Sequence, residues 1–219
     1  MDFAPILLYW RFIAHALAMT LLITVLSIGF GGMVGVVVAI GRTYGGRLLD
    51  AVLGFYVDSM RAIPLLVILI WTYFAFPLML GWNLSPVAAA VLGLSAHLGA
   101  YAAETVRAGL TSIRPGQMRA ALALGMTRAS AVRTIILPQA IIRMLPPIGS
   151  LLVFAVKDSG IASAIAVPEL IRQSQVLSGI TYHAFEVYTL AMGIYFLLCY
   201  PIARGVDAVY RRVAYLGAS

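Results

Sequence analysis

The sequence predicts an all-α integral membrane protein with about five transmembrane helices. Of its 219 residues, 62% are hydrophobic and only 11% are charged, and its mean hydropathy is +0.98. Average soluble domains are roughly 45–50% apolar and about 25% charged. A water-soluble fold of this length could not bury so much apolar surface, so lipid is expected to be its solvent. The chain is expected to form one membrane domain, residues 1–219, because no polar stretch is long enough for a soluble one.

Five apolar stretches reach the length of about 20 residues that a spanning helix needs. The expected spans are residues 12–40, 51–80, 87–106, 147–167 and 188–209. Asp58, Arg61 and Pro64 interrupt the second span, and Pro64 is expected to kink it because proline frees a backbone carbonyl in the preceding turn. In the first span, Gly31 and Gly35 form a small-residue face on which a neighbouring helix can pack closely.

The cations in the loops predict the orientation in the membrane. By this topology, eleven of the 15 Lys and Arg residues lie on one side, after the first and third spans and at the end of the fifth. Cytoplasmic loops carry an excess of Lys and Arg, so this side is expected to be the cytoplasm. The N-terminus is then outside and the C-terminus inside. No basic stretch is interleaved with aromatic residues, so nucleic-acid binding is not expected.

The polar loop between the third and fourth spans, about residues 110–140, contains the most specific pattern. A short helix is expected after a Pro-Gly pair, and Gly125 and Thr127 separate it from a second helix. Leu137 and Pro138 are expected to stop the second helix. Such a pair forms a compact knob on the cytoplasmic face. It binds either a cytoplasmic protein or lipid headgroups, since arginines beside apolar residues suit both.

The same loop resembles the EAA motif of ABC importer permeases, in which Glu-Ala-Ala is followed by Gly and then by Ile-x-Leu-Pro. The matching residues are Ala120, Ala121, Gly125, Leu137 and Pro138. Arg119 stands where the family has Glu, so the salt bridge of that Glu is not expected here. The resemblance implies that the loop is a coupling helix that docks on a separate ATPase.

Further segments resemble the amino-acid branch of this family, and they follow one another in the family's order. They are residues 61–66, 99–107, 138–147, 157–159 and 168–170. The resemblance covers the chain from about Thr20 to the C-terminus. It implies a type I ABC importer permease (MetI-like) fold with a core at about residues 16–209 and cytoplasmic coupling helices.

Charged residues inside the spans are candidates for a substrate pathway. A charge near the bilayer centre costs roughly 2.5–3.5 kcal/mol, so it should face a partner or a water-filled cavity. Lys157 and Asp158 lie in the middle of the fourth span, and neighbours on a helix point about 100° apart. They cannot neutralise each other in one direction, whereas a zwitterionic amino acid offers both opposite charges. Glu104, Arg61 and Pro64 are the other pathway candidates.

Purely structural roles for these charges remain open. The alternative is that ion pairs within or between helices hold the bundle together. These pairs are Lys157 with Glu104, Arg61 with Asp158, Asp58 with Arg61, and Glu104 with Arg107. The last two need only a spacing of three residues on one helix.

The chain lacks the Gly-x-x-x-x-Gly-Lys-Ser/Thr phosphate loop, so it is not expected to bind ATP or to be an enzyme, and no catalytic residue, metal ligand or cofactor is assigned to it. The resemblance implies a permease that moves an amino acid or related polar solute across a bacterial inner membrane by alternating access. Its implied partners are a second permease subunit, two ATP-binding subunits that hold ATP and Mg, and an extracytoplasmic solute-binding protein. Arg119 in place of the Glu implies either a matched ATPase surface or an asymmetric pair whose second permease keeps the Glu, and it favours a heterodimer over a homodimer.

Two other classes remain as alternatives. A secondary transporter would need inverted repeats with broken helices in matching halves, and the sequence has no detectable symmetry. A membrane enzyme would need a nucleophile beside a base, but Ser95 and His97 face away from each other on a helix. Co-purification with an ATPase separates the importer from both.

Overall fold

The computed structural model describes residues 8–214, whose regular elements are all helical. In chain order they are α2 (Trp10–Tyr44), α3 (Arg47–Ala62), α4 (Leu65–Ile70), η1 (Trp71–Ala75), α5 (Phe76–Leu80), α6 (Pro86–Thr111), α7 (Pro115–Ala123), α8 (Arg128–Ala131), η2 (Val132–Ile136), α9 (Leu137–Asp158), η3 (Ser159–Ile165), α10 (Leu170–Thr181) and α11 (Ala184–Val213). Four helical segments are long and apolar enough to cross a membrane, and the bent pair of α3 with α4–α5 makes a fifth. About five transmembrane helices were predicted, and this is confirmed.

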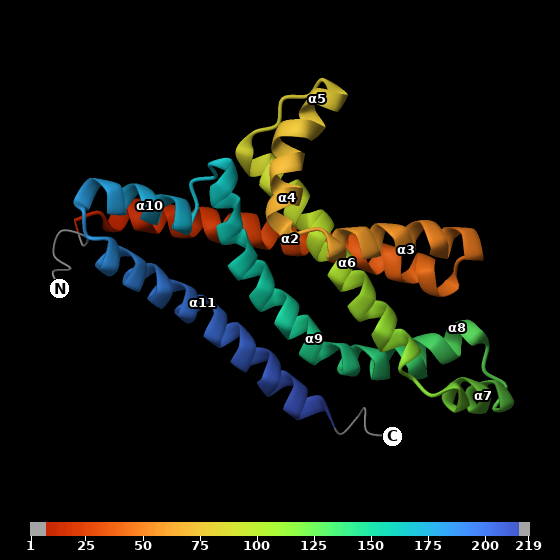
Figure 1. Ribbon diagram of the computed structural model, residues 1–219. Coiled ribbons are helices and arrows are strands. Elements are labelled where there is room, and N and C mark those ends of the chain that lie inside the picture. The colour runs from red at the N-terminus through yellow and green to blue at the C-terminus, as the bar shows by residue number, and fades with distance from the viewer. Residues whose placement is uncertain (1–7, 215–219) are drawn as a thin grey trace.

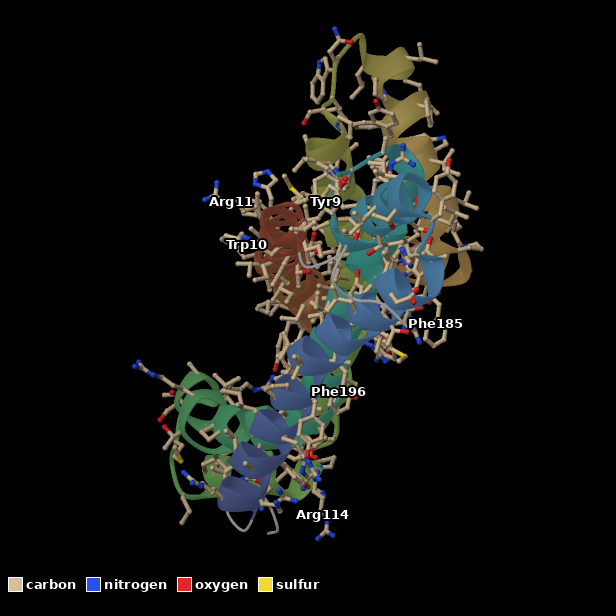
Figure 2. All side chains as sticks on the ribbon, turned by 90° about the vertical axis from the view of Figure 1, so that its left-hand side faces the viewer. Tyr9, Trp10, Arg11, Arg114, Phe185 and Phe196 are labelled. Atoms are coloured by element: carbon tan, nitrogen blue, oxygen red, sulfur yellow. The ribbon has the colours of Figure 1, made fainter. Side chains whose placement is uncertain are left out.

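Helices α2 and α6 cross at the centre of the molecule (Figure 1). Helix α9 packs on α6, and α11 packs on α9. Helix α3 folds back along the C-terminal part of α2, while α10 lies along its N-terminal part. In Figures 1 and 2, α7 and α8 lie at one end of the molecule and α4 and α5 at the other. The polar loop and the second half of the bent span, α4–α5, therefore occupy opposite ends.

Small residues allow α2 and α6 to approach backbone to backbone. A Cβ atom added to Gly31 would lie 2.9 Å from the carbonyl oxygen of Ser95. One added to Gly35 would lie 2.5 Å from the Cβ of Ala102. Lipid tails are as apolar as side chains, so association in a membrane depends on close packing of this kind. The predicted small-residue face of the first span is confirmed.

The second predicted span, 51–80, is two helices rather than one. Helix α3 ends at Ala62 and α4 begins at Leu65, and the two segments are bent by 106°. Ile63 has an extended backbone, with ψ 130°, because a following proline disfavours the helical conformation. Pro64 then forms the N-cap of α4. The expected kink is therefore a complete break.

The fourth span is longer than predicted. The helical segment runs from Arg128 to Ile165, so the predicted stop at Leu137 and Pro138 and the predicted start near Pro147 are wrong. Residues 132–136 form a π-helical turn, in which Leu137 donates its N–H to the oxygen of Val132, five residues back. Proline breaks a regular helix because it lacks an N–H and clashes with the carbonyl four residues back. The wider turn relieves both constraints just before Pro138.

Candidate functional site

The loop between α6 and α9 folds into a knob, which we define as α7, α8 and the turn between them. Helix α7 ends in a Schellman motif, since Gly125 donates its N–H to the oxygen of Leu122 (3.0 Å) and Met126 to that of Ala121 (3.1 Å). Gly125 has φ +82°, which a residue with a Cβ adopts only at a cost. Thr127 then caps α8 by accepting the N–H of Ser130 at 3.2 Å. The predicted break between two short helices is confirmed.

The inner side of the knob is held by a small hydrophobic core. Ile113, Ile136, Ala140 and Met144 form this core with residues of α6 around them. Ala121 on α7 is only 1% exposed. Helix α8 continues through η2 into α9, so the knob and the fourth span belong to one helical segment.

The outer side of the knob is uncovered. Of the predicted coupling residues, Ala121 alone is buried, and the others are exposed: Arg119, Ala120, Gly125, Leu137 and Pro138. Leu124 is 82% exposed and was not predicted. A leucine directly before a left-handed glycine lies past the last turn of its helix. This position in the sequence could have indicated that Leu124 is exposed. The knob thus presents an exposed apolar residue, Leu124, and an exposed cation, Arg119, on a surface that residues 8–214 do not cover.

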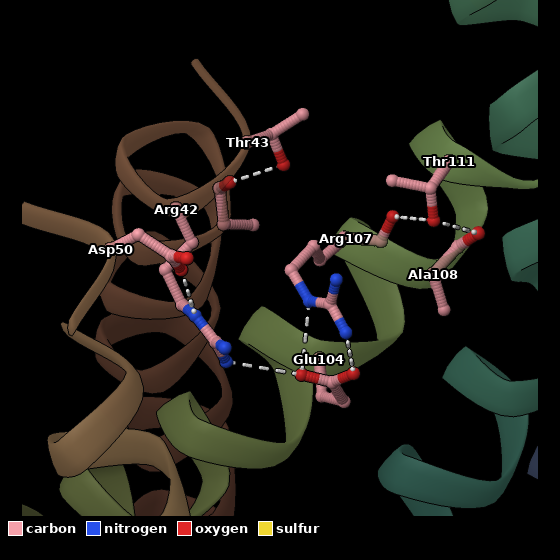
Figure 3. Close-up of polar contacts among 8 residues, drawn as sticks. Arg42, Thr43, Asp50, Glu104, Arg107, Ala108 and Thr111 are labelled. Atoms are coloured by element: carbon pink, nitrogen blue, oxygen red, sulfur yellow. Dashed lines mark hydrogen bonds and ion pairs between the residues drawn. The ribbon is translucent and has the colours of Figure 1, made fainter. Parts of the chain in front are cut away.

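A network of ion pairs joins the ends of α2, α3 and α6 near the knob (Figure 3). Arg107 donates to both carboxylate oxygens of Glu104, through Nε at 3.2 Å and through Nη2, which confirms the predicted local pair. Arg42 donates from Nη1 to Glu104 Oε2 at 3.2 Å and from Nε to Asp50 Oδ1 at 3.1 Å. Arg42 was not predicted as part of this network, because it lies 62 residues from Glu104 in the chain.

Beside this network lies a cavity of about 350 Å³ between α3, α6 and α9, lined by Arg61, Tyr101, Glu104 and Arg143, among others. The guanidinium of Arg61 stands over the ring of Tyr101, 5.4 Å from its centroid. Within residues 8–214, Arg61 forms no ion pair with Asp58 or Asp158, so both predicted pairs are wrong. Arg143 donates to the carbonyl oxygen of Ser112 at 2.6 Å.

Lys157 and Asp158 face different surroundings, as their spacing predicts. Lys157 is exposed and lines a groove of about 300 Å³ between α9 and α11, which Asp207 also lines. Asp158 is half-buried and lies within electrostatic range of His97. In the described part of the chain, Lys157 forms no ion pair with Glu104. Of the five predicted pathway residues, the structure brings only Arg61 and Glu104 into one cavity.

Glu169 is a buried acidic residue that the sequence analysis did not single out as a site. It is 0% exposed and caps α10 by accepting the N–H groups of Ile171 at 2.8 Å and Arg172 at 2.7 Å. The Tyr195 hydroxyl donates to it at 3.4 Å. It lies between the fourth and fifth spans, and burial raises the pKa of its carboxyl to about 7, although the two backbone N–H groups oppose this shift.

A polar contact fastens the start of α10 to α2. The N–H of Leu170 donates to the buried Thr20 hydroxyl at 3.0 Å. A proline followed by an acidic residue before an apolar run is a helix-start pattern, so the capping role of Glu169 could have been predicted. The burial of Glu169 depends on how α2 and α11 pack around it, so it could not have been predicted from the sequence.

Metal-ligating residues do not cluster in residues 8–214, where no group of three or more His, Cys, Asp or Glu side chains could hold an ion. The charged groups that do gather belong to the ion-pair network and to the cavity beside it. These charged side chains can bind a charged group of a solute.

Comparisons with known proteins agree with these features. A family model described as the binding-protein-dependent transport system inner membrane component matches residues 31–215. The chain is 35% identical over 202 residues to the probable amino-acid ABC transporter permease protein YckA of Bacillus subtilis (strain 168), covering 92% of this chain and 87% of that one. It is 35% identical over 181 residues to the glutamine transport system permease protein GlnP of Escherichia coli (strain K12), covering 82% of each.

Solved structures show the same fold. The crystal structure of an amino acid ABC transporter with histidines superimposes with a TM-score of 0.90 at 33% identity, over 97% of this chain and 99% of that one. The MetNI methionine ABC transporter in an inward-facing conformation gives a TM-score of 0.72 at 24% identity, over 97% and 99%. The second likeness concerns the fold alone, and it matches the type I (MetI-like) importer fold that the motifs predict.

Proposed function

The chain belongs to the family of binding-protein-dependent transport system inner membrane components, and we propose that it conducts an amino acid or related small polar solute. It is a permease subunit of an ABC importer, in which ATP hydrolysis resides in a separate subunit. The relatives named for amino acids, including glutamine, support the solute class. The observation that carries the mechanism is the uncovered outer side of the knob, where Leu124 is 82% exposed.

In this proposal the knob receives the motion of the ATPase. The contact surface consists of Arg119, Ala120, Gly125, Leu137 and Pro138, together with the exposed Leu124. Ala121, the remaining predicted coupling residue, is buried and anchors α7 beneath this surface. When the ATPase closes on ATP and Mg, it displaces the knob. Because the helix is continuous from Arg128 to Ile165, this displacement moves the fourth span and produces alternating access.

The solute pathway is proposed to pass the charged groups inside the spans. Arg61 and Glu104 line the cavity between α3, α6 and α9. Pro64 lies at the break between α3 and α4, where backbone groups are free to line a passage. Lys157 and Asp158 lie on the helix that the knob moves, and their charges complement those of a zwitterion.

The proposed assembly contains two permease subunits, two ATP-binding subunits and an extracytoplasmic solute-binding protein. The whole chain, 1–219, acts as one permease domain, with its core at about 16–209 and its coupling loop at about 110–140. The N-terminus is outside and the C-terminus is in the cytoplasm, and the binding protein docks near residues 81–86 and 168–183. Arg119 favours a heterodimer whose second subunit keeps the Glu.

Leu124→Asp tests the coupling surface. In the purified and reconstituted complex, this variant is expected to reduce co-purification of the ATPase and to lower ATP-driven uptake by about ten-fold, since a central apolar contact typically contributes more than about 1 kcal/mol. Leu48→Asp is the matched control. Leu48 is 80% exposed and lies in the first turn of α3, outside the knob. If both variants kept the ATPase and transported normally, the knob would not be the coupling surface.

A further inference from the structure

The cavity between α3, α6 and α9 has an excess of positive charge. Its charged lining residues are Arg61, Glu104 and Arg143. Arg42 and Arg107 stand directly behind Glu104. Glu104 is thus surrounded by four guanidinium groups. Asp50 pairs with Arg42, and Asp50 and Asp58 also act on Arg107 at longer range, so the excess positive charge is that of Arg61 and Arg143 against Glu104 in the cavity lining.

The negative charge of Glu104 is already engaged. Both of its oxygens accept from Arg107, and Oε2 also accepts from Arg42. A carboxylate that receives several charge-assisted hydrogen bonds from guanidinium groups has little remaining attraction for a further cation. An ammonium group of a solute would have to displace these partners before it could bind Glu104.

Arg61 is held in place while its donors remain free. The ring of Tyr101 supports the face of its guanidinium at 5.4 Å. Within residues 8–214, the side chain of Arg61 donates no hydrogen bond and forms no ion pair. A guanidinium that stacks through its face keeps its N–H edges available, and these edges match the two oxygens of a carboxylate.

Arg143 on α9 adds a second cation to the lining of the cavity. Its hydrogen-bond partner is neutral, because Nη1 donates to the carbonyl oxygen of Ser112. Like Arg61, it has no carboxylate within ion-pairing distance among the described residues. Two cations that form no ion pair in the lining of one cavity fit an anionic group between them.

We propose that this cavity selects amino-acid-like solutes of net negative charge, and that Arg61 binds their additional carboxylate. Acidic amino acids and related dicarboxylate derivatives belong to this class. The inference rests on the proposed transport function and specifies its substrate class. Arg42 is a positioning residue in this account: it bridges Asp50 and Glu104 and so keeps Glu104 from attracting cationic solutes.

The experiment measures equilibrium binding of radiolabelled glutamate, glutamine and arginine to the purified permease–ATPase complex without its solute-binding protein. Glutamate is expected to bind at least about ten-fold more tightly than arginine, a difference of about 1.4 kcal/mol. Arg61→Gln is expected to weaken glutamate binding about ten-fold and to change glutamine binding little. Arg61→Lys should retain part of the preference, because it keeps the charge but loses the bidentate edge.

Arg42→Gln tests the positioning role. It leaves Glu104 with one guanidinium partner, so arginine binding should strengthen relative to glutamate binding. Arg47→Gln is the matched control, because Arg47 is exposed at the start of α3 and has no ion pair among the described residues. The control should leave the order of the three affinities unchanged.

Several outcomes separate this inference from the proposed function. If glutamine binds and arginine binds as tightly as glutamate, the charge selection is wrong and the permease function stands. Equal weakening of all three ligands by Arg61→Gln would also overturn the role of Arg61, provided that the thermal midpoint of the variant matches that of the wild type. If none of the three binds and the full complex imports no amino acid, the proposed function itself is overturned.

Discussion

The α2–α6 interface and the α7–α8 knob use glycine for opposite purposes. At the interface, Gly31 and Gly35 let two backbones meet, and a Cβ at Gly35 would lie 2.5 Å from Ala102. In the knob, a Cβ at Gly125 would meet nothing within 4 Å, and the glycine is needed for its backbone φ of +82°. The interface is formed within this chain, whereas the outer side of the knob is not covered by the described residues and is the proposed contact with the ATPase. Stability should therefore be sensitive at the interface and coupling at the knob.

Gly35→Leu should give the largest loss of stability. The leucine side chain cannot fit between α2 and α6 without separating them, and overpacking of this kind costs about 3 kcal/mol. The thermal midpoint of the purified complex, measured with monodispersity in detergent, should fall sharply. Gly29→Leu is the control, because a Cβ there meets nothing within 4 Å. Equal stability of the two variants would mean that the interface is not tightly packed.

Gly125→Ala should separate stability from coupling. Alanine pays about 1–2 kcal/mol in the left-handed conformation, so the turn between α7 and α8 should shift to avoid it. Transport coupled to ATP hydrolysis should drop several-fold, while the thermal midpoint changes little because the knob is exposed. Gly116→Ala, where a Cβ also meets nothing, should behave as wild type. A fall in midpoint as large as that of Gly35→Leu would contradict the distinction between the two regions.

The buried Glu169 provides the smallest expected effect, at the contact of α10 with α2. Burial raises the pKa of its carboxyl to about 7 from the ordinary 4.5. The folded state therefore binds more protons than the unfolded state between these values, so its stability is full below about pH 4.5 and declines as the pH rises to about 7. The thermal midpoint should fall by a few degrees over that range, and Glu169→Gln should flatten the dependence. A midpoint that rises with pH in both proteins would show that other groups dominate.

Local patterns predicted much of the fold, because spans and the Gly31–Gly35 face depend on residues close together in the chain. The pair of Glu104 with Arg107 was predictable for the same reason, since three residues separate them on one helix. Arg42 was missed because its contact with Glu104 depends on how α2 and α6 cross. Pro138 was misread as a helix stop because a π-helical turn is a backbone adjustment with no clear sequence signature.

The pathway residues were predicted as a set, but their grouping was not. Arg61 has Asp58 three residues away, yet it stacks on Tyr101 from another helix. A spacing of three residues makes an ion pair available, and tertiary packing decides whether it forms. Leu124 shows the converse: the exposure of a leucine is visible only once the helices are placed, and this exposure supports the proposed coupling surface.

The most direct test of the coupling account is cross-linking at the knob. The permease carries Leu124→Cys in a Cys199→Ser background, and the ATPase carries one cysteine at a time on its permease-facing surface. The assembled complex is treated with a short bifunctional maleimide. We expect a cross-linked permease–ATPase product whose yield changes when ATP is added. The position should also react with an impermeant thiol reagent only from the cytoplasmic side. Reaction only from the outside, without any cross-link to the ATPase, would contradict the account.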